Sequence, residues 1–198
     1  MTPPIWRGKV REREAIVAAL LRAGANVNAR CRGVYGPAHH LAPLKSACFD
    51  KGFPPSNIVA QLIAAGADIE AADNNGFFPL YTAAQNGRGD TVSQLLAAGA
   101  DPHRRSTNTN KVTALHGATV TRNSHAYAPL LRAGATLPPA SRRRDAYLDK
   151  IAATPGGYPV YERAHRTRLA AIFIPKFPGL PVEVIHHIVS IWADCGGH

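Results

Sequence analysis

The cysteines and histidines are the side chains of this chain best suited to chemistry, but their spacing forms no reactive site. Cys31, Cys48 and Cys195 are odd in number, widely spaced and without a CxxC pair, which favours reduced thiols over a disulfide framework. Cys195 and His198 are three residues apart, yet a zinc site there would need tetrahedral ligands converging from the end of the chain. We therefore expect no metal and no cofactor.

Other signatures of catalysis are also missing from the sequence. There is no Gly-rich phosphate loop, no HExxH pair and no nucleophile elbow. His39 and His40 are adjacent, but they are more typical of a loop tip than of a pair of ligands. The sequence predicts a protein that is not an enzyme.

The composition is that of a globular protein with one or two domains. The 198 residues are 45% hydrophobic, which suffices for a buried core. No run approaches the roughly 18–20 apolar residues of a membrane span. The first residues lack an apolar signal core, which favours a protein that is not secreted. We expect it in the cytoplasm, with the nucleus as the alternative.

The net charge of +10 comes from 23 basic and 13 acidic side chains. Such a charge can attract an acidic protein, an anionic membrane or nucleic acid. The charges are spread along the chain, and no RNA- or DNA-binding motif accompanies them. A solvated basic surface is the simpler interpretation, and binding to nucleic acid or an anionic surface is the alternative function.

A phrase of the type Leu-Leu-x-Ala-Gly-Ala, with Ile as its second residue in one case, occurs four times and indicates how the chain is organised. Its glycines, Gly24, Gly66, Gly99 and Gly134, are 42, 33 and 35 residues apart. A period near 33, with a helix-ending glycine in each unit, predicts a stacked repeat array. Such an array usually binds a partner across a long surface, so its function depends on how the helices and loops of the repeats are arranged more than on any single reactive side chain.

The clearest unit runs from residue 73 to residue 101 and predicts a turn followed by two helices. Residues 74–76, Asn-Asn-Gly, favour a tight turn, and Pro79 suits a first helical position. Gly87 is expected to end the first helix, and Asp90 to cap the second. Neither helix can bury its apolar face alone, so the units must stack.

This unit resembles an ankyrin repeat, whose usual pattern is D-x-x-G-x-T-P-L-H-x-A-A, a second helix, and then L-L-x-x-G-A-D. The resemblance covers about residues 1–137. It implies an all-α ankyrin solenoid of helix-turn-helix repeats with short β-hairpin-like fingers, in a first domain of about four repeats over residues 1–139. It also implies that His116, at the histidine of the pattern, makes structural hydrogen bonds between repeats.

The other units depart from the pattern in ways that point to a binding face. The first keeps its second helix, at residues 15–21, but its first helix is vague, as expected of a terminal capping repeat. The second has extra residues in its finger (32–40) and between its helices (53–56), and the fourth has a longer finger (106–111). Insertions in solenoids fall in loops and often on the binding face.

The resemblance implies that a partner lies against the finger tips and the exposed side of the first helices. We expect a protein partner, acidic because the fingers are basic, and a monomeric chain. Phe77 is the expected anchor, since aromatic side chains and arginine are typical of interface centres; the alternative is that it packs on the neighbouring finger. The partner-binding positions carried over are Arg32, Tyr35, His39, Asn74, Asn75, Phe77, Gln85, Asn86, Arg104, Arg105 and Lys111.

The repeat pattern stops after Pro139, and residues 140–174 are expected to form a helical cap or linker. One helix is predicted to start at Ser141, a plausible N-cap, and to end before Pro155. A second is predicted over residues 161–173. Together they would cap the apolar end of the stack as a degenerate final repeat.

The last segment, residues 175–198, predicts one helix after Pro181 that is apolar around much of its circumference. Such a helix does not lie free in water, so we expect it to be buried in its own domain or in a partner. Its apolar residues form two stripes at helical spacing: Val182, Ile185, Val189 and Trp192, and Val184, Ile188 and Ile191.

The run Leu180-Pro181-x-Glu183-Val184-x-x-x-Ile188 resembles the first helix of an F-box. It resembles still more the PRANC segment that follows ankyrin arrays in poxvirus-type proteins. A SOCS-box resemblance ranks lower, because the Leu-x-x-x-Cys element is absent around Leu169. The F-box-like resemblance implies docking on the Skp adaptor of a cullin ubiquitin ligase through Leu180, Pro181, Glu183, Val184, Ile185 and Ile188.

The function that these patterns indicate is a non-enzymatic protein–protein interaction module. The sharper hypothesis is a substrate-recognition adaptor for a cullin-type ubiquitin ligase, in which the repeats select the substrate.

Overall fold

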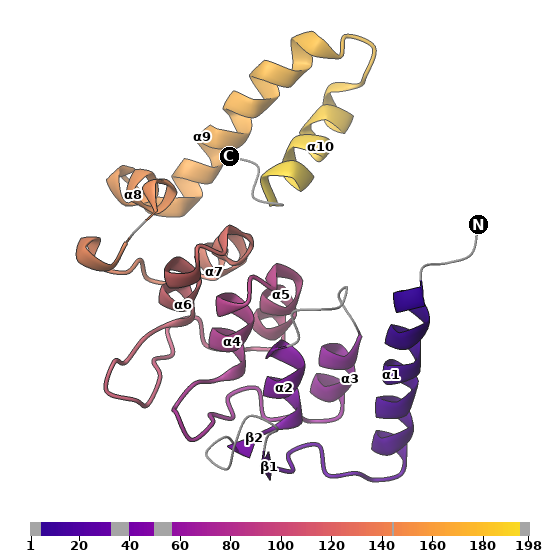
Figure 1. Ribbon diagram of the computed structural model, residues 1–198. Helices are drawn as coiled ribbons and strands as arrows, with labels where there is room; N and C mark the ends of the chain where they lie inside the picture. The colour runs from indigo at the N-terminus through magenta and orange to yellow at the C-terminus, as the bar shows by residue number, and fades with distance from the viewer. Residues whose placement is uncertain (1–4, 33–39, 50–56, 144, 195–198) are drawn as a thin grey trace.

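Pairs of short helices alternate with extended loops along most of the chain (Figure 1). The computed structural model describes residues 5–32, 40–49, 57–143 and 145–194, and over these it has the all-α solenoid architecture that the sequence predicts. The elements are α1 (Ile5–Arg22), β1 (Cys31–Arg32), β2 (His40–Leu41), α2 (Pro43–Phe49), α3 (Ile58–Ala64), α4 (Pro79–Gln85), α5 (Gly89–Ala97), α6 (Ala114–Thr121), α7 (Tyr127–Arg132), α8 (Ala146–Ala153), α9 (Gly157–Phe173) and α10 (Val182–Asp194), with single 3-10 turns at Ser124–Ala126, Ala140–Arg142 and Ile174–Lys176.

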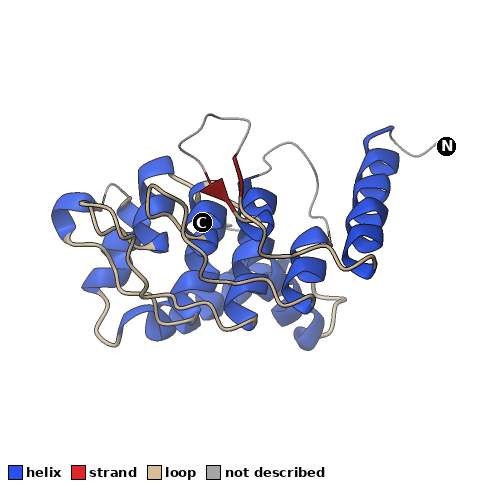
Figure 2. Ribbon diagram, turned by 90° about the horizontal axis from the view of Figure 1, so that it is seen from below, coloured by secondary structure: helices blue, strands red, loops and turns tan. Residues whose placement is uncertain are grey.

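The helices of the repeats form two layers. The first helices of successive units, α2, α4 and α6, pack side by side and are called inner helices below. The second helices, α1, α3, α5 and α7, form the outer layer. Figure 2 shows the fingers running across one face of this array. The leucines between the layers are buried: Leu44, Leu80 and Leu115 from the inner helices, and Leu62, Leu95 and Leu130 from the outer ones.

The recurrent glycines end the outer helices, as predicted. Gly24, Gly66, Gly99 and Gly134 all have positive φ angles, from +80° to +96°, which residues with a β-carbon rarely adopt. After α5, for example, the amide of Gly99 donates to Leu96 O at 3.0 Å. The repeated glycine-containing phrase therefore ends the outer helix in the same way in every unit.

Polar side chains in the fingers join each unit to the next. Asn28 Oδ1 accepts from the amide of Asp68 at 2.8 Å, and Glu70 Oε1 accepts from the amide of Asp101 at 2.9 Å. The finger before α2 also contains an antiparallel strand pair, in which Cys31 faces Leu41 and Arg32 faces His40. This pair is the hairpin-like finger that the resemblance implies.

The first unit differs from the prediction. Instead of a vague first helix followed by a second helix at 15–21, residues 5–22 form the single helix α1. Residues 9–22 contain neither Gly nor Pro, so nothing in them interrupts helical hydrogen bonding. In the described part of the chain, no inner helix precedes α2.

Three helix starts also differ from the prediction. Helix α5 begins at Gly89, so Asp90 lies in its first turn and does not cap it. Ser141 lies in a 3-10 turn, and α8 is instead capped by Asp145, whose Oδ1 accepts from the amide of Tyr147 at 2.9 Å. Helix α9 starts four residues early, at Gly157, because Pro159 is tolerated in a first turn.

The C-terminal helices continue from the array. Leu148 and Ile151 of α8 and Tyr158 of α9 belong to the same buried cluster as the repeat leucines. Helix α10 then runs back beside α9 (Figure 1) and packs against it through a separate, smaller apolar cluster. The predicted domain boundaries at 139 and 174 remain predictions.

Candidate protein-binding surfaces

The finger of the third unit is held in shape by one buried carboxylate. Asp73 Oδ1 accepts from the amides of Asn75 and Phe77, each at 2.9 Å. Asp73 Oδ2 accepts from the Lys45 ammonium of α2, and both side chains are buried. Burial lowers the pKa of Lys45, since desolvation disfavours the charged form. The turn is thus fixed to the helix behind it, so the side chains at its tip are preorganised.

Four of the predicted partner-binding residues are exposed on two neighbouring fingers. Asn74 and Asn75 lie at the tip of the third finger, and Arg105 and Lys111 lie on the fourth. The fingers are joined by a hydrogen bond of 3.2 Å from the amide of Thr107 to Gly76 O. The structure therefore brings two amides and two cations onto one continuous edge of the array.

Phe77 and Arg104 contribute to the array itself. The Phe77 ring is half-buried and stacks on Tyr81, with 4.5 Å between centroids and 17° between planes. The Arg104 guanidinium pairs with Glu70 and lies 5.0 Å from the centroid of the Phe78 ring. Because both side chains already have partners inside the protein, they are poorer candidate anchors than the exposed tip residues.

Gln85 and Asn86 lie half-buried at the end of α4 and link inner helices. The Gln85 carbonyl accepts from Thr121 Oγ1 at 2.9 Å and also from Asn123 Nδ2. Asn86 Nδ2 donates to the Cys48 carbonyl at 3.5 Å. Of the remaining predicted positions, Tyr35 and His39 lie outside the described residues, and Arg32 is described only through its backbone pairing in β1.

Helix α10 has one covered stripe and one exposed stripe. Ile185 and Val189 are buried against Leu169 of α9. Ile185, predicted to bind an adaptor, is therefore not on the surface, because α9 occupies its side of the helix. The other implied adaptor-binding residues, Leu180, Pro181, Glu183, Val184 and Ile188, are all exposed. The helix was expected to be buried in its own domain or in a partner; its own domain covers Ile185 and Val189, and burial of the exposed residues in a partner stays a prediction.

A metal site, a membrane span and a reactive thiol each need a particular arrangement of residues. They contain no cluster of three or more His, Cys, Asp or Glu side chains able to hold a metal ion. No helix among them has the length and apolar character needed to cross a bilayer. Burial raises the pKa of the Cys48 thiol to about 12, which leaves almost no thiolate at neutral pH. Cys195 and His198 lie outside the described residues.

Comparison with known proteins identifies the repeats. Residues 44–138 match the family model for ankyrin repeats, in three copies. In addition, 51 residues are 51% identical to part of the 2-5A-dependent ribonuclease of Mus musculus, a match that covers 25% of this chain and 7% of that protein. Residues 44–138 are therefore ankyrin repeats, and the described chain is all-α, an ankyrin solenoid followed by the helices α8, α9 and α10. Ankyrin repeats generally form non-enzymatic modules for protein–protein interaction.

Both matches concern the repeats alone. The chain spans only 7% of the length of the mouse ribonuclease, so nothing about that enzyme's activity follows for this chain. The family match ends at residue 138. The F-box-like character of residues 180–188 therefore remains a prediction.

Sequence reasoning missed one exposed surface, at the amino end of the array. Ile16 and Leu20 of α1 are more than half exposed, beside a cavity between α1, α2 and α3. The sequence did hold a signal for it. No run of the T-P-L-H type precedes residue 15, which is why the first helix of this unit was predicted only as vague, but the exposure of Ile16 and Leu20 was not predicted from this.

Proposed function

We propose that the chain recruits a protein through the fingers of its third and fourth repeats and presents it, through α10, to the Skp-type adaptor of a cullin ubiquitin ligase. The observation that carries this proposal is the exposed apolar stripe on α10. The same helix is anchored on its opposite side by α9.

The exposed stripe has the spacing of a helix that docks into a groove. On α10, Val184 and Ile188 are four residues apart and are 41% and 44% exposed, and Leu180, which is 41% exposed, lies in the bend just before the helix. Residues four apart lie on the same side of a helix, and such rows of apolar side chains anchor a helix in the groove of a partner. Because Ile185 and Val189 already hold α10 against α9, docking would not require the helix to order first.

The finger edge has the chemistry of a surface for an acidic protein. Arg105 and Lys111 are exposed beside Asn74 and Asn75, and the whole chain carries a net charge of +10. Complementary charge accelerates encounter and excludes partners of the wrong sign. The exposed amides can supply directional hydrogen bonds within the same patch.

The adaptor role is tested by co-expressing the chain with a Skp-type adaptor. We expect the two to co-purify, and we expect the double variant Val184→Asp, Ile188→Asp to abolish the complex. Val120→Asp is the matched control, since Val120 is 62% exposed on α6, far along the chain from α10. Absence of a complex at micromolar concentrations of both wild-type proteins would contradict the proposal.

The alternative function, binding to nucleic acid or an anionic surface, has a different signature. Binding dominated by phosphate contacts weakens steeply as salt concentration rises. Affinity for DNA or RNA that falls at least about tenfold between low and physiological salt, without any adaptor complex, would favour that alternative.

A further inference from the structure

Each inner helix of this array has an equivalent surface, called the helix seat below, on which in α4 and α6 the inner helix of the preceding unit packs. In α4 the positions equivalent to Gly117 and its neighbours in α6 are Pro79, Thr82 and Ala83, and all are buried. The equivalent positions of α6, residues 114, 117 and 118, are buried as well. The approach is close, because a β-carbon on Gly117 would lie 2.8 Å from a ring carbon of Tyr81 in α4.

The same seat on α2 is uncovered. Its three positions are Pro43, Ser46 and Ala47; Ser46 is exposed and the other two are only half-buried. No described residue occupies the place in front of α2 that α4 occupies in front of α6. Helix α2 thus has the small, flat surface that receives an inner helix elsewhere in the array.

The outer helix of the first unit is uncovered on the matching side. Leu20 of α1 is 54% exposed, whereas the leucines at the same repeat position, Leu62, Leu95 and Leu130, are 5%, 0% and 0% exposed. Ile16 is 59% exposed, whereas its counterpart Ala126 in α7 is fully buried. The exposed surfaces of α1 and α2 therefore result from one missing helix.

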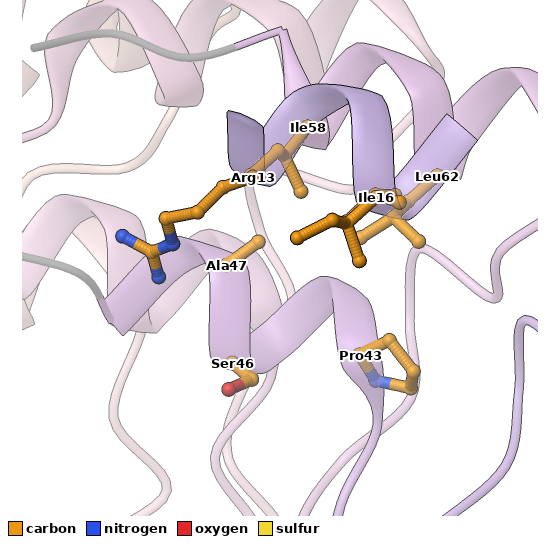
Figure 3. Close-up of a pocket in the computed structure, with 8 residues that line it drawn as sticks. Arg13, Ile16, Pro43, Ser46, Ala47, Ile58 and Leu62 are labelled. Atoms are coloured by element: carbon orange, nitrogen blue, oxygen red, sulfur yellow. The ribbon is translucent and has the colours of Figure 1, made fainter. Parts of the chain in front are cut away.

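Between these surfaces lies a groove of about 350 Å³, lined by Arg13, Ile16, Val17, Pro43, Ser46, Ala47, Ile58 and Leu62. Figure 3 shows Ile16 and Arg13 extending from α1 across the groove, with Pro43, Ser46 and Ala47 on the wall that α2 forms. A cavity of this size accepts side chains that project from one face of a helix. The walls are mostly apolar, so burying them would favour association.

We propose that this groove, which we call the N-terminal groove, binds a short amphipathic helix of another protein in the place of the missing inner helix. The site lies apart from both the finger edge and α10, and so adds to the function proposed above. The inner helices of this array are seven or eight residues long, which sets the length of the bound helix at about two turns.

The charge of the N-terminal groove indicates which side chains the bound helix should carry. Arg13 is the charged side chain of the lining, and it is exposed. A carboxylate flanking the apolar face of the bound helix can approach this guanidinium, and Arg pairs well with carboxylates. The occupant is therefore a helix with small and aliphatic or aromatic residues on one face and an acidic residue at its edge.

The test uses a synthetic peptide of residues 76–88, which contains α4, with Tyr81→Ala, because Ser46 occupies the position at which Gly117 accommodates the Tyr81 ring. Isolated helices of this length are marginal in water, so the peptide is cross-linked between residues i and i+4 on its opposite face. Two versions carry either two Glu or two Lys residues at one end. Binding to the isotope-labelled full chain is followed by NMR.

We expect saturable shifts confined to residues 13–20, 43–47 and 58–62. Ser46→Arg should weaken binding by at least about tenfold, whereas Ser93→Arg, at an exposed serine of α5, should leave it unchanged. The Glu version should bind at least about threefold more tightly than the Lys version, and Arg13→Glu should reverse this order.

Two outcomes would overturn the proposal. One is the absence of shifts at millimolar peptide, or shifts that Ser46→Arg leaves unaltered. The other is a dimer of the chain alone in light scattering that Ser46→Arg converts to monomer, because the groove would then belong to a second copy. Neither outcome bears on the adaptor complex, which is measured separately.

Discussion

At the carboxyl end of the array, α8 and α9 pack onto the last repeat and bury Leu148, Ile151 and Tyr158 in its core. At the amino end, α1 is present without an inner helix, and Leu20 and Ser46 are exposed. A solenoid needs a polar terminal unit to remain soluble alone. The carboxyl end meets this requirement with added helices, whereas the amino end keeps an apolar groove.

The difference shows that identical side chains at equivalent positions of a repeat need not be equally buried. Leu20 and Leu62 occupy the same position of the repeated phrase, yet only Leu62 has an inner helix of its own unit over it. The burial of a side chain therefore depends on which helices pack beside it in the array, and not on the repeated sequence alone. Substitutions at equivalent positions are therefore the direct way to test the comparison.

The largest effect is expected at Lys45, on the side of α2 that faces the third unit. Lys45→Met leaves the Asp73 carboxylate buried without its cation, and we expect a loss of about 3–5 kcal/mol in the free energy of unfolding. Ser46→Ala, one residue further on the open side, should change it by less than about 0.5 kcal/mol. Urea unfolding followed by circular dichroism measures both.

A second variant distinguishes the lost ion pair from lost packing. In Lys45→Met with Asp73→Asn, no charge remains buried, and the amide oxygen can still accept from the amides of Asn75 and Phe77. The double variant should regain part of the stability. If Lys45→Met proves as mild as Ser46→Ala, the two sides of α2 do not differ as the structure indicates.

The next effect compares the repeated leucines. Leu130→Ala removes a fully buried side chain and should cost about 2–5 kcal/mol through lost burial and the cavity that remains. Leu20→Ala should cost less than about 1 kcal/mol, because more than half of that side chain is already in water. The same urea titrations apply. Equal costs would mean that the amino end is covered in solution by something that the described residues do not include.

A smaller effect is expected at the helix seat itself. Gly117→Ser places atoms against the Tyr81 ring and should destabilise the array by about 1–3 kcal/mol through overpacking. Ser46→Thr, at the equivalent position of α2, should be neutral within about 0.5 kcal/mol. In a Tyr81→Leu background the cost of Gly117→Ser should shrink, which a double-mutant cycle measures. No coupling between the two sites would contradict the close packing of α4 on α6.

The sequence predicted the elements of the repeats well, because the signals are local. The glycine of each phrase stops its outer helix, and Pro79 starts an inner one. Contacts between units were not predictable in the same way. Lys45 and Asp73 are 28 residues apart in sequence, and nothing in either residue shows that stacking will pair them.

The candidate sites show the same limit. The two stripes of α10 are both apolar, and the packing of Leu169, Phe173 and Ile174 on one side of the helix decides that Ile185 is buried while Val184 is exposed. Phe77 was expected to be an anchor because it lies in a finger. Its stacking on Tyr81 depends on the course of the turn that Asp73 holds. The tip residues Asn74, Asn75 and Arg105, by contrast, are exposed, and their role in binding a partner stays a prediction.

The smallest effect tests how the carboxyl cap is attached. Glu162 Oε1 of α9 accepts from Arg132 Nε of α7 at 2.8 Å and from Arg166 Nη2 at 2.9 Å, so one carboxylate joins the cap to the last repeat. Both arginines are about one-third exposed, and water screens the pairs. Glu162→Gln should therefore cost only about 0.5–1 kcal/mol, and less at high salt.

Glu183→Gln, at an exposed residue of α10, is the matched control and should leave stability unchanged within about 0.5 kcal/mol. Thermal melts at low and high salt measure both variants. A cost for Glu162→Gln close to that of Leu130→Ala would show that charge holds the cap in place. The small cost expected here means that Leu148, Ile151 and Tyr158 hold it through buried apolar surface, which is the contact that the amino end of the array lacks.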